Sequence, residues 1–120
     1  MALTGAKYQE LSLGQYGSVY TTSGVEEINP PTNHIFAAIT FLEDTVFDAS
    51  GGLIAETATK FINTDTAAHD LAAGAETEDQ GTGGAVVDSV VFPKGLTIFG
   101  RWIEIDVLSG KVIAYIAPSH

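Results

Sequence analysis

The chain has 120 residues and no cysteine, and its 15 acidic and 5 basic residues give a formal net charge of −10 at pH 7. This length suits one domain, and the lack of cysteine excludes disulfide scaffolds and thiolate zinc sites. A strongly negative chain repels phosphate groups, so we expect neither nucleic acid nor an anionic membrane as a partner.

Charged residues make up only 17% of the chain, against about 25% in ordinary soluble domains. Either partner subunits cover part of the surface, or uncharged polar residues keep the chain soluble.

The N-terminal residues lack the basic and apolar regions of a signal peptide, and no run approaches the ~20 apolar residues that span a bilayer. We therefore expect a protein made in a cytoplasm.

Residues 1–34 are rich in Gly, Ser, Thr and Pro and contain few large aliphatic side chains. Only residues 8–13 alternate as a strand does, and the consecutive prolines Pro30 and Pro31 favour extended backbone. We predict an extended N-terminal arm that packs along its own domain or reaches a neighbour. Its large apolar side chains are candidate interface residues: Tyr8, Leu11, Leu13, Tyr16 and Tyr20.

The first strongly apolar segment follows the arm. Both faces of residues 35–42 carry apolar side chains at a period of two, which predicts a strand that is buried on both faces. Residues 48–52 have the composition of a turn, and 53–62 form a short strand or one helical turn. The alanine content of 66–75 allows a short helix, and 76–84 read as an exposed loop.

The clearest pattern lies in residues 85–116. It predicts a strand over 85–92, a tight turn at Pro93-Lys94-Gly95, a long strand over 96–108, a hairpin turn at Ser109-Gly110 and a last strand over 111–117. The apolar residues of the long strand change phase half-way, which predicts a bulge near Gly100 and Arg101. We expect Gly100 to form this bulge because glycine tolerates positive φ.

These elements predict a mostly β fold. The strands would form a single antiparallel β-sandwich or jelly-roll-like domain over residues 35–120, preceded by the extended N-terminal arm, residues 1–34.

No set of residues predicts catalysis. The chain has no cysteine nucleophile and no G-x-S-x-G motif, and the three histidines, His34, His69 and His120, lie far apart in the sequence. We therefore expect neither an enzyme nor a bound cofactor.

A cation site has slightly better support. Glu76, Glu78 and Asp79 cluster between glycines, and His69 and Asp70 precede them, but their spacing matches no EF-hand loop. We interpret this segment as a solvated loop and predict no metal site.

Arg101 and Trp102 form the most notable pair of side chains. They could make a sugar-binding platform, but Trp and Arg are also enriched in cores and in subunit interfaces. We favour the core or the interface for them. Four residues are expected to shape turns or the bulge: Pro93, Gly95, Gly100 and Gly110.

Residues 91–102 read VFPKGLTIFGRW and residues 109–115 read SGKVIAY. Both stretches resemble the C-terminal part of small virion proteins of tailed bacteriophages, and 38–45, AITFLEDT, resembles another recurring piece of them. The resemblance implies a virion component, in the first place a head decoration (cement) protein. Such a protein binds the major capsid protein or other virion proteins on the outer head surface, as a homotrimer, and stabilises the head.

Two alternatives stay open: a tail-associated or fibre-associated module, and a carbohydrate-binding β-domain.

Independently of the resemblance, the sequence favours an oligomer, because residues 35–42 and 111–116 are apolar on both faces. That is more apolar surface than a monomer of 120 residues encloses easily.

Overall fold

A computed structural model describes residues 15–57, 61–64 and 85–119 of the chain. Several predictions concern residues outside these ranges: the strand at 8–13 with Tyr8, Leu11 and Leu13, the helix at 66–75, and the loop at 76–84 with its acidic cluster. His69, Asp70 and His120 also lie outside the described residues.

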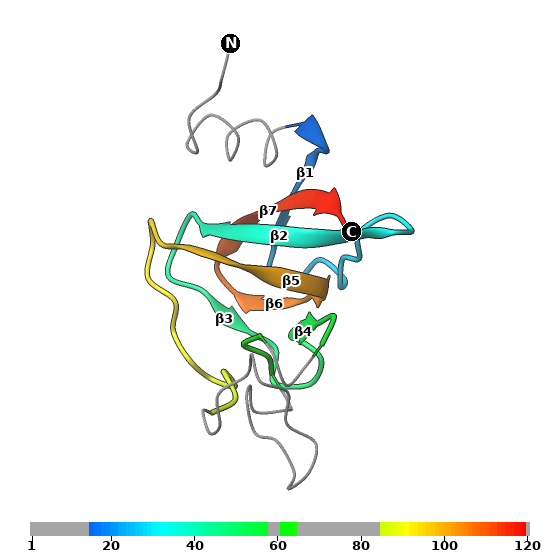
Figure 1. Ribbon diagram of the computed structural model, residues 1–120. Helices are drawn as coiled ribbons and strands as arrows, with labels where there is room; N and C mark the ends of the chain where they lie inside the picture. The colour runs from blue at the N-terminus through cyan, green and yellow to red at the C-terminus, as the bar shows by residue number, and fades with distance from the viewer. Residues whose placement is uncertain (1–14, 58–60, 65–84, 120) are drawn as a thin grey trace, which may run out of the picture.

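Seven strands make up the regular structure of the described residues (Figure 1). In chain order they are β1 (Ser18–Thr22), β2 (His34–Phe41), β3 (Val46–Phe47), β4 (Leu53–Ala55), β5 (Thr97–Ile105), β6 (Val107–Ser109) and β7 (Lys111–Pro118). The predicted mostly β class is confirmed.

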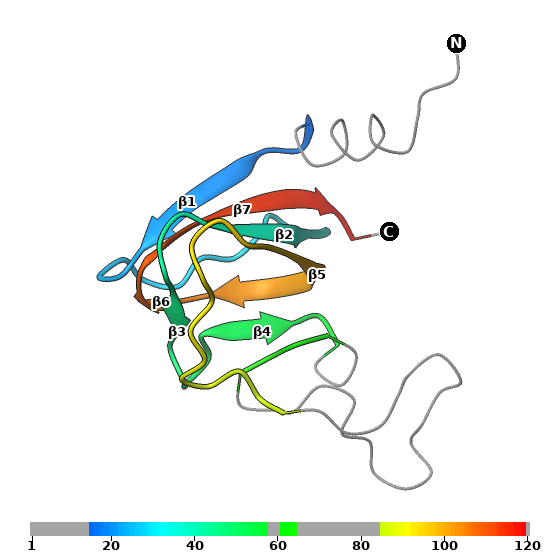
Figure 2. The ribbon, with the colours of Figure 1, turned by 90° about the vertical axis from the view of Figure 1, so that its left-hand side faces the viewer.

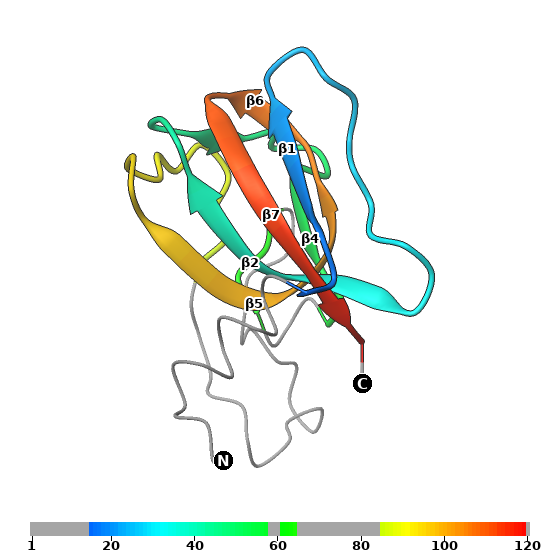
Figure 3. The same ribbon diagram turned by 90° about the horizontal axis from the view of Figure 1, so that it is seen from above.

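Five of the strands form one antiparallel sheet in the order β1-β7-β2-β5-β4, which Figure 2 shows from top to bottom. The remaining two, β3 and β6, pair with each other in a small second sheet. Seen from above in Figure 3, β1 runs beside β7, and the main sheet is strongly twisted. The two central strands, β2 and β7, come from the two segments that are apolar on both faces.

One hydrophobic core joins both sheets. The alternating residues Val112, Ala114 and Ile116 of β7 are buried, as expected for a strand that turns one face inward. The other members of this core are Phe36, Ile39, Phe41, Phe47, Leu53, Ala55, Phe92, Trp102, Ile105 and Val107.

Three phenylalanines link the small sheet to this core. Phe41 stacks on Phe92 with the ring centroids 4.9 Å apart, and Phe47 meets both rings edge-on. Such offset and edge-to-face pairs stabilise a core beyond the area that they bury.

β5 has an extra residue relative to β2 near Gly100 and Arg101, where a bulge was predicted. Phe36 of β2 lies opposite Trp102, whereas Ala38 lies opposite Phe99, so β5 has one residue more than β2 between these pairs. β2 in turn has one residue more than β7 in the same region. Bulges that lie beside one another in neighbouring strands bend the sheet there.

The physical reason for Gly100 differs from the one we expected. Its φ is not positive, so the backbone there suits any residue. The constraint is steric, because a Cβ at this position would lie 2.8 Å from two carbons of the Trp102 ring. Since Trp102 is fully buried, the ring has little room to move away.

The described part of the predicted arm packs along its own domain. β1 pairs with β7 over its whole length, from Ser18 opposite Tyr115 to Thr22 opposite Lys111. Further along, the N–H and C=O groups of Ile28 both bond to Ile105. Residues 18–34 are therefore attached to the main sheet by backbone hydrogen bonds.

The strand predicted over 85–92 is wrong. This segment contains a turn, in which Val90 N donates to Val87 O, and it makes only an isolated bridge from Phe92 to Thr45. Ser89 has a positive φ of 59°, which a regular strand does not accommodate.

The hairpin predicted at Ser109-Gly110 is also wrong. The predicted long strand breaks at Asp106, where the chain leaves the main sheet, and β6 pairs with β3 rather than with β7. Gly110, with φ at 105°, therefore marks a corner between two sheets.

The turn predicted after Phe92 is present, but Pro93 occupies a different position in it from the one expected. Leu96 N donates to Pro93 O, so Pro93 is the first residue of the turn, not the second. Gly95 is its third residue with φ at 90°, the position that requires glycine in a type II turn.

Candidate interaction surface

The main sheet has a second face, opposite the core. On β7 the residues that alternate with the buried ones are Lys111, Ile113, Tyr115 and Ala117, and all four are half-buried. On β2 the residue Ala38 is buried but lies outside the core cluster. On β5 the ring of Phe99 is 64% exposed. We call this the outer face.

The strand register arranges the outer face in two rows. One row runs across four strands as Ser18, Tyr115, Ala38 and Phe99, and the next runs as Tyr20, Ile113, Thr40 and Thr97. The hydroxyl groups of Thr40 and Thr97 bond to each other at 2.9 Å, so these two polar groups already have a partner within the face.

The two rows carry no charge, although the chain has a net charge of −10. Neither row contains an acidic or basic residue. The nearest charge along β7 is Lys111, which forms an ion pair with Glu43 at 3.4 Å. A neutral surface with exposed aromatic rings on a charged protein is typical of an interface core.

Trp102 lies in the core, one of the two places expected for it, and not at a surface where it could contact a partner. Its side chain is fully buried in the core, and its Nε1 donates to Ile62 O at 2.9 Å. The indole offers no face to a partner or to a sugar. The alternative of a sugar-binding platform of Arg101 and Trp102 is therefore excluded.

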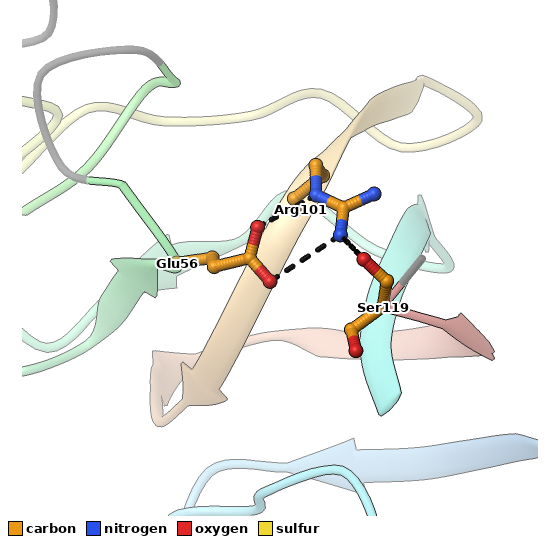
Figure 4. Close-up of polar contacts among 3 residues, drawn as sticks. All are labelled: Glu56, Arg101 and Ser119. Atoms are coloured by element: carbon orange, nitrogen blue, oxygen red, sulfur yellow. Dashed lines mark hydrogen bonds and ion pairs between the residues drawn. The ribbon is translucent and has the colours of Figure 1, made fainter. Parts of the chain in front are cut away.

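Arg101 fastens three parts of the chain together (Figure 4). Its Nε donates to Glu56 Oε1 at 2.7 Å, and its Nη2 donates to Glu56 Oε2 at 3.3 Å and to the carbonyl oxygen of Ser119. The hydrogen bond to Glu56 raises the pKa of Arg101 above its ordinary value. The guanidinium therefore holds the end of β7 and the residue after β4 against β5.

The predicted aromatic residues of the arm divide between two places. Tyr20 is 55% exposed and belongs to the outer face. Tyr16 is also exposed, with its ring 6.3 Å from that of His34. His34 Nδ1 bonds to the carbonyl oxygen of Thr32 at 2.8 Å, which is a structural contact.

Phe99 and Tyr115 lie on the outer face and were not among the residues predicted for an interface. The signal was present, because an apolar second face of 35–42 and 111–116 was predicted. For Phe99 the signal was its position between Ile98 and Gly100, because alternation places it on the face opposite Ile98 and Trp102.

Four carboxylates gather at the edge of the sheet where β5 ends. Burial raises the pKa of Glu104, and so do a hydrogen bond with Glu27 and the charges of Glu27 and Asp106. Burial also raises the pKa of Asp106, together with the charges of Asp48 and Glu27. Removing one of these charges should therefore stabilise the fold near neutral pH.

We expect Glu104→Gln to raise the melting temperature at pH 7. The raised pKa means that the folded state binds protons more readily than the unfolded chain, so this group favours folding below its ordinary pKa. That contribution is lost as the pH rises through the raised value. Thermal unfolding between pH 4 and pH 7 checks this, since the gain should shrink toward the acidic end.

Glu26→Gln is the matched control, because Glu26 is an exposed residue outside the carboxylate cluster and the substitution removes the same charge. Two results would contradict repulsion among these carboxylates: an equal rise in melting temperature for both variants, or a rise for Glu104→Gln that does not depend on pH. Either result would mean that only the lower net charge stabilises the protein.

Within the described ranges, no three His, Asp or Glu side chains are placed to hold a metal ion. No helix among residues 15–57, 61–64 and 85–119 has the length and apolarity to cross a membrane.

Comparison of the chain with protein-family models, with curated proteins and with solved structures finds no match.

Proposed function

We propose that the chain is a structural protein of a tailed-bacteriophage virion: a head decoration protein that binds the major capsid protein on the outer head surface as a homotrimer. The role is structural and involves no catalysis, no nucleic acid and no membrane. We also propose a fold of the sandwich or jelly-roll type, in which the main sheet and the β3–β6 sheet are the two layers.

One observation carries the proposal. The three stretches that resemble small phage virion proteins, residues 38–45, 91–102 and 109–115, lie side by side in the structure. β2 pairs with both β5 and β7, and Thr45 exchanges two backbone hydrogen bonds with Phe92. The resemblance therefore covers one packed unit at the centre of the sheet rather than three unrelated segments.

The surface charge supports an outward position on a particle that contains DNA. A net charge of −10 disfavours contact with a packaged genome. Within the described residues, two of the few basic side chains, Arg101 and Lys111, are engaged in ion pairs with Glu56 and Glu43. The excess of 15 acidic over 5 basic residues suits contact with basic patches of a capsid protein.

The experiment measures where the chain binds on phage particles and how it changes their heat stability. The particles are isolated from a lysate of the host cells in which the chain is made. Antiserum against the purified chain should label the heads in immunogold electron microscopy. Heads stripped of the protein should release DNA at a lower temperature, and added purified chain should restore the original value. A ligand that binds only the assembled head stabilises it by mass action.

Labelling of tails, or no labelling with no change in heat release, would overturn the head assignment. A variant lacking residues 1–14 tests the tether, because this deletion leaves every described strand in place. The longer deletion to residue 30 would remove β1 from the main sheet. If the arm is the tether, the shorter variant should fold and no longer bind heads.

A further inference from the structure

We propose that the connection between β1 and β2, residues 23–33, is a pH-sensitive strap. In acidic solution it lies closed on the end of β5, and it opens more often as the pH rises to neutral. Figure 3 shows this connection as a long loop at one side of the main sheet. The strap does not depend on the proposed function, because it involves this chain alone.

Two strap residues hold its middle on β5. Ile28 N donates to Ile105 O at 2.8 Å, and Ile105 N donates to Ile28 O at 3.0 Å. Asn29 Nδ2 donates to Ile103 O at 2.9 Å. The Ile28 side chain packs partly buried against the core, in which Ile105 is fully buried. Opening of the strap would therefore expose the backbone edge of β5 and this end of the core.

The register brings acidic side chains together where the strap crosses β5. Ile28 and Ile105 form an antiparallel pair, so Glu27 lies opposite Asp106 and diagonal to Glu104. Side chains in these positions share one face of the sheet and come within reach of one another. Like charges that lie opposite each other in an antiparallel pair weaken the pairing. Ionised carboxylates therefore work against the hydrogen bonds that close the strap.

The side chains that face Glu104 and Asp106 are mostly acidic. Glu27 forms a hydrogen bond with Glu104, which two carboxyl groups can make only when one of them carries a proton. Asp48, whose N–H donates to Asp106 O at 3.0 Å, adds its negative charge beside Asp106. The amide of Asn29 acts in the opposite direction, because its hydrogen bond to Glu104 favours the ionised carboxylate.

No basic side chain in the described part of the chain offsets this repulsion. Neither Lys nor Arg is among the groups that shift the pKa of Glu104 or of Asp106. Arg101 and Lys111 are engaged in ion pairs elsewhere. On β4 the residue opposite Glu104 is Ile54, which carries no charge.

The sign of the pH dependence follows from these contacts. In the closed state burial and the neighbouring carboxylates raise the pKa of Glu104 and that of Asp106. When the strap opens, Glu27 moves away and its part of the repulsion is lost. The closed state therefore binds protons more readily than the open state, so acidic solution favours closure. This preference is fully present below the ordinary pKa of the carboxyl groups and is lost as the pH rises through the raised values.

The test is amide hydrogen exchange of the full chain, followed by NMR at pH 4 and pH 7. Protection factors, which correct for the intrinsic exchange rate at each pH, report local opening. The protection of the Ile28 and Ile105 amides should fall by about fivefold or more from pH 4 to pH 7. The reference is the Phe41 amide, which donates to Leu96 O at 2.9 Å and does not contact the strap. Its protection should change less.

Three variants identify the groups responsible. In Glu27→Gln and Glu104→Gln the fall in protection at Ile28 should shrink to less than about twofold. Glu26→Gln is the matched control, because it removes the same charge from the adjacent exposed residue and should keep the full pH dependence. An equal fall at Phe41 would mean that the whole fold loosens and would overturn the strap. Protection that rises with pH would also overturn it, as would an equal effect of Glu26→Gln and Glu27→Gln.

Discussion

Gly100→Ala should destabilise the protein by about 1–3 kcal/mol, the usual cost of an overpacked core. At an open position with negative φ the same change stabilises a protein by about 0.4–1 kcal/mol, because it restricts the unfolded chain. At Gly100 the new Cβ would lie 2.8 Å from the Trp102 ring. The sign of the effect, measured by urea unfolding, therefore reports this contact directly.

A double-mutant cycle with Trp102→Phe isolates the contact. The atoms nearest to the new Cβ, Cη2 and Cζ2 of Trp102, belong to the second ring of the indole, which phenylalanine lacks. In the Trp102→Phe background the cost of Gly100→Ala should fall below about 1 kcal/mol, because residues in contact are not additive. Equal costs in both backgrounds would show that strain in the backbone, and not the indole, excludes a side chain at this position.

The central part of the fold could be predicted because its signals are local. β2 and β7 have runs of β-branched and aromatic residues, which fit a pleated, half-buried surface. The change in apolar phase along β5 was also visible: Trp102 and Ile105, three residues apart, both lie in the core, and β5 has one residue more than β4 between Trp102 and Glu104. These features depend on the sequence within a few residues of each strand.

The errors concern partners that lie far away in the sequence. Residues 85–92 carry four valines, and a local pattern does not distinguish a strand from a turn that exposes Val90 and Val91. The signal at Ser109-Gly110 indicates a reversal of the chain, but not that β6 pairs with β3 in another sheet. Such pairing depends on tertiary packing, which overrides local propensity.

The sequence predicts that the sheet has a second apolar face, but it does not identify all of the residues on that face. Tyr20 was identified from the arm, and the second apolar face of the central strands was expected. Trp102 was assigned to either core or interface because a large aromatic side chain suits both. Alternation along β5 places Phe99 and Trp102, three residues apart, on opposite faces, but the local pattern does not say that the face of Trp102 is the one buried in the core.

Gly110→Ala should have the largest effect of any glycine substitution discussed for this chain, about 3 kcal/mol or more. Its φ of 105° is strained for any residue with a side chain. In addition, the new Cβ would meet the backbone of Asp44 and Thr45 at 2.6–2.7 Å. That backbone has no room to move, because Thr45 is fully buried and exchanges two backbone hydrogen bonds with Phe92.

Gly95→Ala separates the two causes, because Gly95 has a similar φ of 90° but no atom within 4 Å of the added Cβ. This variant should lose only the cost of the left-handed backbone, about 1–2 kcal/mol. The difference between the two variants in urea unfolding then measures how tightly the corner at Gly110 packs on Thr45. Equal losses would mean that this corner has room for a side chain, and the close packing of the corner on Asp44 and Thr45 would be wrong.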